Sequence, residues 1–341
     1  MTAKPIVALT LGDPAGIGPE LTAKLLARDD IRAMAHIVLA GDRWLWEDGQ
    51  DIAGVAVDTR EIQRLEGLDF ADHTPLFLPL NTVSPGEVTR GVANAAGGRS
   101  VLAVLDDVVA AAGGQVDAVC FAPLNKHAMK QGGLAFDDEL HHFAHRLAVQ
   151  DYVCELNVLD NLWTSRITSH VALKEVAPLI DQGRIVEAAK LVYRTLVQAG
   201  VAEPRVAVAG LNPHAGDGGN FGREEIDIIA PAVAQLQGLG FPVTGPWPAD
   251  TVFLKAKDGE LDAVVTMYHD QGQIAMKLLG FDRGVTVQGG LPVPITTPAH
   301  GTAYDISGQN RASVNATVNA FRIACRMGLA RRRARSQGES L

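Results

Sequence analysis

Short apolar runs alternate with longer stretches of helical character along the whole chain. Runs of four to eight residues that are rich in Val, Ile, Leu and Ala predict buried strands. Such runs lie at residues 6–11, 37–40, 118–122, 206–211 and 263–267. Amphipathic or Ala-rich segments predict helices at residues 19–27, 93–112, 224–237 and 314–329. This alternation predicts an α/β fold with a largely parallel sheet.

The chain length of 341 residues is enough for about two domains. No long low-complexity linker divides the chain, so we expect two interleaved lobes with more than one crossing between them. Hydrophobic residues make up 47% and charged residues 20%, which excludes a disordered or fibrous protein.

The charge balance argues against a nucleic-acid partner, because the formal net charge is −9. The one basic cluster, Arg331–Arg333 with Arg335, is interpreted as a frayed, solvated helix end. No apolar run approaches the ~20 residues of a membrane helix, and no signal peptide is recognised. The three cysteines are far apart, so we expect no disulfide framework and a reducing, cytoplasmic compartment.

Polar motifs follow several of the predicted strands. They are GDPAGIGPE (12–20), PLNK (123–126), the segment 212–222 that begins NPHAG, and YHDQG (268–272). Open α/β sheets bind ligands at the carboxyl ends of their strands, so these motifs are the candidate site.

Three histidines share this setting: His170 in TSH, His214 in NPHAG and His269 in YHDQG. Three imidazoles on one cation leave a position open for a substrate oxygen. Their wide spacing matches no local metal motif, and a lone core or loop histidine is the alternative for each. Zinc, cobalt, manganese and nickel remain open, and magnesium is a further possibility.

Charged residues near these motifs are candidate catalytic groups. Asp250 and Asp270 are candidates to orient the metal ligands by accepting hydrogen bonds from them. The alternative is that each carboxylate caps a helix N-terminus or stabilises a turn. Lys277 lies on an otherwise apolar IAMKLLG stretch, where it is a candidate to bind an anion or move a proton. Its alternative is a lysine that extends from a helix face into solvent.

His141 and His142 are candidates for hydrogen bonds to a phosphate or hydroxyl, although a solvated helix face also explains them. The loops 12–20 and 300–308 (HGTAYDISG) are Gly-rich but match neither GxGxxG nor the P-loop. We nevertheless take Gly12 and Asp13 as candidate cofactor residues. No GxSxG motif is present, and no cysteine has a histidine within three residues, so a covalent hydrolase is not supported.

Together, TLGDPAGIGPE, PLNK, TSH, GLNPHAGDGGNFGREE, YHDQG and HGTAYDISG resemble the 4-hydroxythreonine-4-phosphate dehydrogenase family, over residues 6–325. The resemblance implies a two-lobed isocitrate/isopropylmalate dehydrogenase-like fold with an active-site cleft between the lobes. It also implies a homodimer that uses NAD and a divalent cation, most often zinc. We expect one lobe from residues 1–125 and 290–341, with the NAD loop, and a second from residues 126–289, with the metal ligands.

The family's residues map onto matching positions of this chain. His170, His214 and His269 match its metal ligands, shared across the dimer interface, and Lys277 matches a substrate-binding lysine. His300, Gly301 and Asp305 fall in the loop that resembles the adenosine-binding loop of isopropylmalate dehydrogenases.

Departures from the family pattern affect the substrate. DDELHHF (137–143) stands where the biosynthetic enzymes carry GHTE, and Thr286 and Ile295 replace an Asn and an Arg that contact substrate. An isoleucine cannot hold the anionic group that an arginine binds. DDELHHF and CELNVLDNLWTSRITSH (154–170) instead resemble the catabolic subgroup.

Those catabolic enzymes oxidise 4-phospho-D-threonate or 4-phospho-D-erythronate at C3 and release CO2, leaving dihydroxyacetone phosphate. We expect this activity here. The alternatives are biosynthetic 4-hydroxythreonine-4-phosphate oxidation, a terephthalate cis-dihydrodiol dehydrogenase-like enzyme, and a non-catalytic sensor of metal or NAD.

Overall fold

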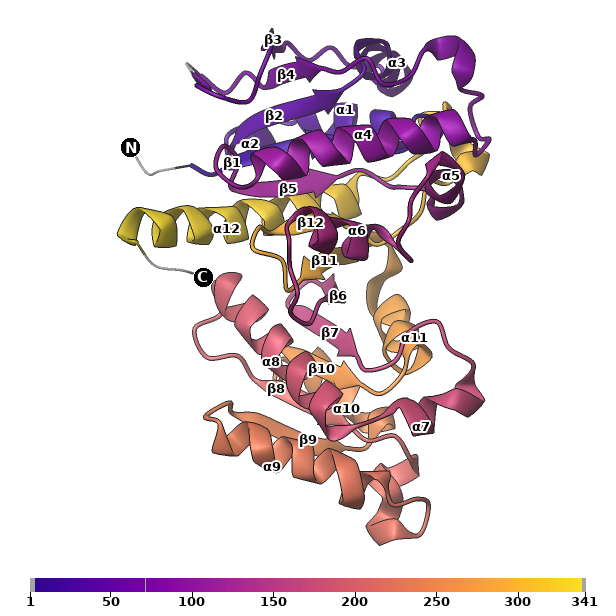
Figure 1. The fold of residues 1–341 in the computed structure, drawn as a ribbon, viewed down its shortest axis with the longest axis vertical. Helices are drawn as coiled ribbons and strands as arrows, with labels where there is room; N and C mark the ends of the chain where they lie inside the picture. The colour runs from indigo at the N-terminus through magenta and orange to yellow at the C-terminus, as the bar shows by residue number, and fades with distance from the viewer. Residues whose placement is uncertain (1–3, 71, 339–341) are drawn as a thin grey trace. The chain divides into compact units, whose positions relative to one another are not determined.

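The computed structural model describes residues 4–70 and 72–338, which form two compact α/β units (Figure 1). Unit 1 comprises the chain up to Gln150, the short segment Val285–Val287 and the chain from Leu291 onward. Unit 2 comprises Asp151–Gly284 and Gln288–Gly290. The chain therefore passes between the units more than once.

Unit 1 is built on a mostly parallel sheet with the strand order β3-β4-β2-β1-β5-β12-β11, in which only the β11–β12 pair is antiparallel. The strands are β1 (Ile6–Thr10), β2 (His36–Gly41), β3 (Arg60–Glu61), β4 (Leu76–Pro79), β5 (Ala118–Phe121), β11 (Val285–Gly289) and β12 (Ile295–Pro298). The helices are α1 (Gly18–Leu26), α2 (Asp29–Arg32), α3 (Arg43–Ala53), α4 (Ala95–Ala111), α5 (Lys126–Gly132), α6 (Glu139–Arg146) and α12 (Asn315–Gln337), with 3₁₀ turns at Pro85–Glu87 and Tyr304–Ile306.

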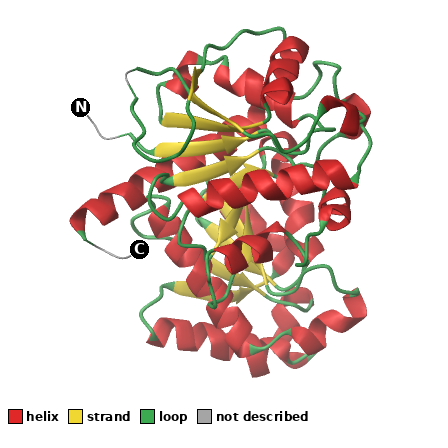
Figure 2. Ribbon diagram, turned by 45° about the horizontal axis from the view of Figure 1, so that its top comes forward, coloured by secondary structure: helices red, strands yellow, loops and turns green. Residues whose placement is uncertain are grey.

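Helices cover both faces of this sheet (Figure 2). The α4 side chains Val101, Leu105 and Val108 pack with sheet residues in one apolar core, while α12 contacts β1, β5 and β12. The same core contains Met129 and Phe143 from α5 and α6. These two helices bury their apolar side chains in this core and belong to unit 1, which includes the chain up to Gln150.

Unit 2 has a second mostly parallel sheet, in the order β6-β7-β10-β8-β9, with only β6 antiparallel to its neighbour. Its strands are β6 (Cys154–Leu159), β7 (Leu162–Arg166), β8 (Val206–Ala209), β9 (Val243–Trp247) and β10 (Ala263–Thr266). Its α-helices are α7 (Val176–Leu179), α8 (Gln182–Gln198), α9 (Ala230–Gly238), α10 (Ala249–Lys257) and α11 (His269–Gly280), with shorter helical turns at Leu173–Glu175, Pro213–Gly219, Glu225–Ile229 and Phe281–Arg283.

The apolar side chains of α10 and α11 pack on one face of this sheet, where Val252, Phe253 and Met276 meet Ala207 and Val264. Helix α8 contacts β7, β8 and β10. The mostly parallel sheets with helical layers confirm the predicted α/β fold class. Among the described residues, no helix combines the length and the apolar character needed to cross a membrane.

One sequence interpretation is wrong for part of the C-terminal helix. Helix α12 continues to Gln337 rather than ending near residue 329. Arg331 is buried, and its guanidinium donates to the carbonyl oxygens of Ala112 at 2.9 Å and Val116 at 3.0 Å. These hydrogen bonds hold the end of α12 against the segment that follows α4, so Arg331 does not belong to a frayed, solvated end. Arg333, in contrast, is exposed.

Candidate functional site

Two of the three candidate metal-ligand histidines meet beyond the carboxyl ends of β7 and β10. The backbone N–H of Thr168 donates to the Met267 carbonyl oxygen at 3.1 Å, and the Thr168 hydroxyl donates to the same oxygen at 2.9 Å. These bonds hold the TSH segment alongside YHDQG. The ring centroids of His170 and His269 consequently lie 5.6 Å apart. Both side chains are accessible.

The carboxylate that follows His269 orients its ring. His269 Nδ1 donates to Asp270 Oδ1 at 2.7 Å, which leaves Nε2 with its lone pair for a ligand. Metal-binding histidines commonly donate their second ring N–H in this way. Asp250 lies in the first turn of α10, and this helix contacts the turn that carries His214.

The backbone at two of the candidate ligands is strained. His170 has φ +51° and His214 has φ +53°, in the left-handed region that residues other than Gly rarely adopt. His214 opens a run of six residues with positive φ, 214–219. Strain of this kind persists only where surrounding contacts enforce it, and it concentrates at functional sites.

His214 lies in the turn Pro213–Gly219, which follows β8. Its ring lies 6.2 Å from the Phe221 ring. Within a single chain, the described residues contain no group of three or more His, Cys, Asp or Glu side chains arranged to hold a metal ion. The chain thus presents two adjacent imidazoles and a third on a strained turn, and imidazole nitrogens suit zinc, cobalt and nickel.

A buried guanidinium links the elements behind the histidine pair, which the sequence analysis missed. Arg166, at the end of β7, donates to Glu155 Oε2 at 2.8 Å and Asn157 Oδ1 at 2.9 Å, and its Nε donates to the Ser169 hydroxyl. Gln273 of α11 donates to the same Asn157 oxygen at 2.6 Å. This network connects the residue before the first histidine with the helix that begins at the second.

Lys277 lies two helical turns after His269 on α11, and its side chain is exposed. Two apolar side chains on the same helix are also exposed, Ile274 at 60% and Leu278 at 84%. Helix α11 therefore carries a histidine of the pair, the candidate catalytic lysine and an uncovered apolar surface.

In unit 1, a buried aspartate joins the two Gly-rich loops. Asp13 is 1% exposed; Oδ1 accepts from the Ala15 N–H and Oδ2 accepts from the Tyr304 hydroxyl, both at 2.8 Å. Burial raises the pKa of the Asp13 carboxyl, although both hydrogen bonds act in the opposite direction. Gly12 is required sterically, since a Cβ there would lie 2.7 Å from the Pro123 carbonyl oxygen. Gly12 and Asp13 thus stabilise the loop 12–20 through buried contacts.

The second loop is fixed by further bonds but remains accessible at its surface. The Ile17 N–H donates to Thr302 O at 3.1 Å, and the loop 300–308 exposes Gly301 and Asp305. Burial lowers the pKa of His300, which favours its neutral ring. These exposed groups are the parts of the predicted cofactor loop that a ligand can contact.

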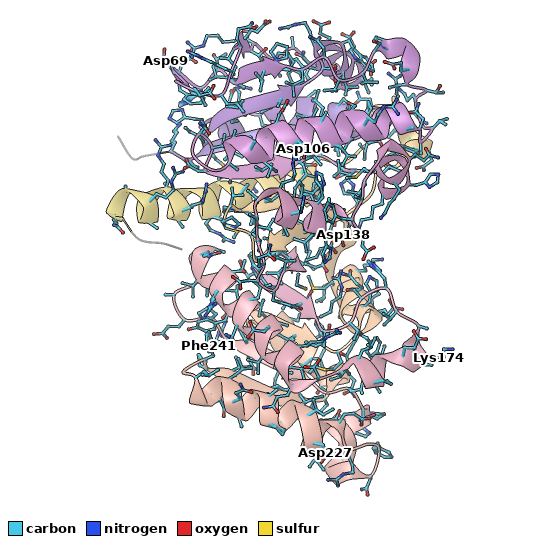
Figure 3. The ribbon with its side chains drawn as sticks, in the orientation of Figure 1. Asp69, Asp106, Asp138, Lys174, Asp227 and Phe241 are labelled. Carbon is cyan, nitrogen blue, oxygen red and sulfur yellow. The ribbon has the colours of Figure 1, made fainter. Side chains whose placement is uncertain are left out.

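The two neighbouring histidines of α6 have different carboxylate partners, Asp138 and Asp106, which are labelled in Figure 3. His141 is 52% exposed and its Nδ1 lies 2.6 Å from Asp138 Oδ1. Burial opposes ionisation of Asp138, but hydrogen bonds from His141 hold its pKa below the usual value. His142 is 12% exposed and bonds Asp106 on α4 at 2.8 Å. Of the pair, His141 is the one available to a ligand.

The two residues at positions of altered family contacts lie in strands. Thr286 in β11 is nearly buried and pairs across the sheet with Thr297. Ile295 in β12 is fully buried, aligned with Val119 in the apolar core of unit 1. Ile295 therefore offers no exposed surface to a substrate.

Comparisons with known proteins agree over nearly the whole chain. The family model described as pyridoxal phosphate biosynthetic protein PdxA matches residues 33–324. A Pseudomonas aeruginosa protein provisionally named 4-hydroxythreonine-4-phosphate dehydrogenase 2 is 56% identical, covering 95% of this chain and 97% of that protein. The D-threonate 4-phosphate dehydrogenase of Cupriavidus necator is 37% identical, covering 93% and 96%.

Among solved structures, 4-hydroxythreonine-4-phosphate dehydrogenase from Klebsiella pneumoniae superposes with a TM-score of 0.85 at 35% identity, covering 96% of this chain and 99% of that one. A terephthalate 1,2-cis-dihydrodiol dehydrogenase from Burkholderia xenovorans LB400 gives a TM-score of 0.65 at 30% identity, covering 94% and 98%.

Proposed function

Because the chain belongs to the PdxA family, we propose that it is an NAD- and divalent-metal-dependent dehydrogenase of a phosphorylated four-carbon sugar acid. The relatives support a dehydrogenase that acts on a hydroxyl group. The proposed reaction oxidises the C3 hydroxyl of 4-phospho-D-threonate or 4-phospho-D-erythronate. Loss of CO2 from the resulting 3-keto acid then gives dihydroxyacetone phosphate.

The observation that carries the substrate assignment is the side chain at position 295. The resemblance places an arginine there in the biosynthetic enzymes, whereas here Ile295 is fully buried among apolar side chains. No guanidinium is available at this position for the anionic group that such an arginine binds. The D-threonate 4-phosphate dehydrogenase among the relatives supports the same substrate class.

The residues present fit a divalent cation and NAD. His170, His214 and His269 would hold the cation, with Asp270 orienting one ring. When bound, the cation would lower the pKa of the substrate hydroxyl and stabilise negative charge on that oxygen, while NAD would accept the hydride. The loop 300–308, with its exposed groups, would contact the cofactor.

The chain's own side chains then bind the substrate and move protons. Lys277 is exposed on the helix that begins at His269, where an ammonium group can pair with a carboxylate or phosphate or deliver a proton. His141 presents an accessible imidazole for a phosphate or hydroxyl. Asp250 lies in the first turn of α10, a helix that contacts the turn bearing His214, and in this proposal it orients that ligand.

A homodimer with a shared metal site completes the proposal. Within one chain the histidine pair is not joined by a third ligand among the described residues. Helix α11, which begins at His269 and carries Lys277, also exposes Ile274 and Leu278. A second copy that covers this helix would bury apolar area, and we place the interface there.

The test is NADH formation by the purified full-length protein with added Zn²⁺, Co²⁺ or Mn²⁺. The substrate panel is 4-phospho-D-threonate, 4-phospho-D-erythronate, 4-hydroxy-L-threonine phosphate and a terephthalate cis-dihydrodiol. We expect turnover of a phosphorylated sugar acid, with dihydroxyacetone phosphate as product. Turnover of the amino substrate alone would show that position 295 does not set the substrate.

The other outcomes identify other functions. Turnover of the dihydrodiol alone would indicate a terephthalate cis-dihydrodiol dehydrogenase, the activity named for the Burkholderia xenovorans enzyme. Binding of NAD and metal without any turnover would indicate a sensor. Either result would overturn the sugar-acid assignment.

A further inference from the structure

We propose that Glu225 is a positioning residue that fixes the turn presenting His214. The inference rests on the proposed function, because it takes His214 as a metal ligand. Glu225 contacts neither substrate nor cofactor in this proposal. It acts through the backbone that precedes and follows His214.

The Glu225 carboxylate lies inside the loop that follows β8. The residue is 2% exposed. Its Oε1 accepts from the backbone N–H groups of Leu211 and Asn212, both at 2.7 Å, and its Oε2 accepts from Asn212 Nδ2 at 2.9 Å. Three donors from the two residues before the Pro213-His214 step therefore converge on one carboxylate.

Glycines allow the backbone on both sides of His214 to approach this carboxylate. A Cβ on Gly216 would lie 2.7 Å from Glu225 Oε2, and a Cβ on Gly210 would lie 3.0 Å from Oε1. Gly216 also has φ +81°, which a side chain would strain. The loop is thus folded around the carboxylate, with no space for larger residues.

The turn needs such a support. His214, Ala215 and Asp217 all adopt left-handed conformations, which are unfavourable for a residue other than Gly. Glu225 supplies bonds that offset this cost and opens the π-helical turn Glu225–Ile229. Single π turns are rare and are frequent at functional sites.

Glu225→Gln tests the carboxylate with little change in volume. An amide has one acceptor oxygen, so in either orientation its NH₂ group would oppose a donor of the loop. Rotation of the Asn212 amide would relieve one such conflict. That rotation would break its bond with Glu224 Oε2, at 2.6 Å. We expect the turn to lose its fixed geometry.

The experiment is calorimetric titration of the metal-free, full-length protein with Co²⁺. We expect Glu225→Gln to weaken Co²⁺ binding by about 10-fold or more, as substitutions behind metal ligands do. Asp227→Asn is the matched control, since this exposed carboxylate on the same helical segment pairs with Arg223 at 2.9 Å outside the loop (Figure 3). We expect it to change the affinity by less than about 2-fold.

A double-mutant cycle separates positioning from general loss of structure. His214→Ala removes the ligand, so adding Glu225→Gln to it should change Co²⁺ affinity by less than about 2-fold. Equal weakening by Glu225→Gln with and without His214 would overturn the inference. Exchange of the Leu211 and Asn212 amide hydrogens gives a second readout and should accelerate in Glu225→Gln.

The cycle also distinguishes the two levels of failure. No Co²⁺ binding by the natural protein, or unchanged binding by His214→Ala, would overturn the metal site and the inference together. Weakened binding by His214→Ala with unchanged binding by Glu225→Gln would overturn the inference alone. If circular dichroism shows that Glu225→Gln does not fold, Gly216→Ala is the second variant, because its methyl group would crowd Glu225 Oε2. It should weaken Co²⁺ binding to the same extent. Unchanged Co²⁺ binding by Gly216→Ala would contradict the inference.

Discussion

One of the hydrogen bonds that connect the two Gly-rich loops of unit 1 joins the side chains of Tyr304 and Asp13. Tyr304 donates to the buried Asp13 carboxylate at 2.8 Å, and burial together with the nearby carboxylate raises the pKa of the Tyr304 phenol. The phenol therefore stays protonated and remains a donor across the pH range of ordinary assays. A hydrogen bond to a charged group contributes about 1.5–3 kcal/mol, enough to fix the shape of the proposed cofactor loop.

Tyr304→Phe should therefore weaken NAD binding more than it slows turnover. Loss of about 1 kcal/mol of loop preorganisation raises the KM for NAD by about 5-fold, while kcat changes by less than about 2-fold. Initial-rate kinetics with varied NAD checks this split. Tyr193→Phe removes a hydroxyl from unit 2, where the Tyr193 ring packs edge-on against Phe241, and serves as the control. An unchanged KM for NAD in Tyr304→Phe would show that the Tyr304–Asp13 hydrogen bond does not contribute to cofactor binding.

Lys277→Ala should affect turnover far more than NAD affinity. The lysine is exposed on the helix that starts at His269, so its loss removes a cation from the proposed substrate site without disturbing the cofactor loop. We expect kcat to fall by about 100-fold or more, as for loss of a proton-transfer group, with NAD affinity unchanged within about 2-fold. Lys257→Ala removes an exposed lysine at the end of α10 and should match the natural protein. An unchanged rate in Lys277→Ala would exclude this residue from the site.

At residue scale, the sequence identifies groups whose chemistry is local and misses groups that act through distant partners. His214 and His269 stand beside Gly and Asp in polar motifs after predicted strands, so their positions mark a candidate site. Glu225 and Arg166 are charged residues, which usually lie at the protein surface. Here both are buried, and several hydrogen bonds satisfy each charged group. Only the folded loop reveals those bonds.

Helix α11 combines chemistry and a contact surface in one element. It begins at His269, carries Lys277, and exposes Ile274 and Leu278, which lie one turn apart. Side chains at this spacing project from the same helix face. This apolar strip, on the helix that begins at His269, is the surface that a second copy would cover in the proposed dimer.

Leu278→Glu should shift the protein from dimer to monomer. A charge at a position that is 84% exposed in the single chain costs little in the monomer but opposes burial in an interface. Light scattering during size-exclusion chromatography measures the mass, and we expect at least a 10-fold weaker dimer. Leu239→Glu, at a residue 55% exposed after α9, is the control. A dimer of unchanged affinity in Leu278→Glu would place the interface elsewhere.

Elements with regular periodicity were predicted closely, and irregular ones were not. The strand predicted at residues 263–267 is β10 (Ala263–Thr266), and the helix predicted at 93–112 is α4 (Ala95–Ala111). The left-handed turn after β8 has no sequence pattern of its own, because Gly, Asn and Asp indicate only a loop. The end of α12 depends on Arg331, whose partners lie on other elements.

At the scale of the whole molecule, the candidate groups divide between the two units. The proposed cofactor loop and the Asp13–Tyr304 link belong to unit 1, whereas the three histidines, Glu225 and Lys277 belong to unit 2. The described hydrogen bonds that support each group come from the same unit as the group itself. This division predicts that NAD and metal affinities can be changed separately.

Crossed measurements test this division. Tyr304→Phe should weaken NAD binding and leave Co²⁺ binding within about 2-fold, whereas His214→Ala should weaken Co²⁺ binding and leave NAD binding within about 2-fold. In the double variant, each loss in binding free energy should equal that of the single variant to within about 0.5 kcal/mol, because the two sets of contacts share no partner. Calorimetry of each ligand in the absence of the other measures the four affinities. A fall in NAD affinity in His214→Ala as large as that in Tyr304→Phe would show that one shared site, rather than two separately supported ones, binds both ligands.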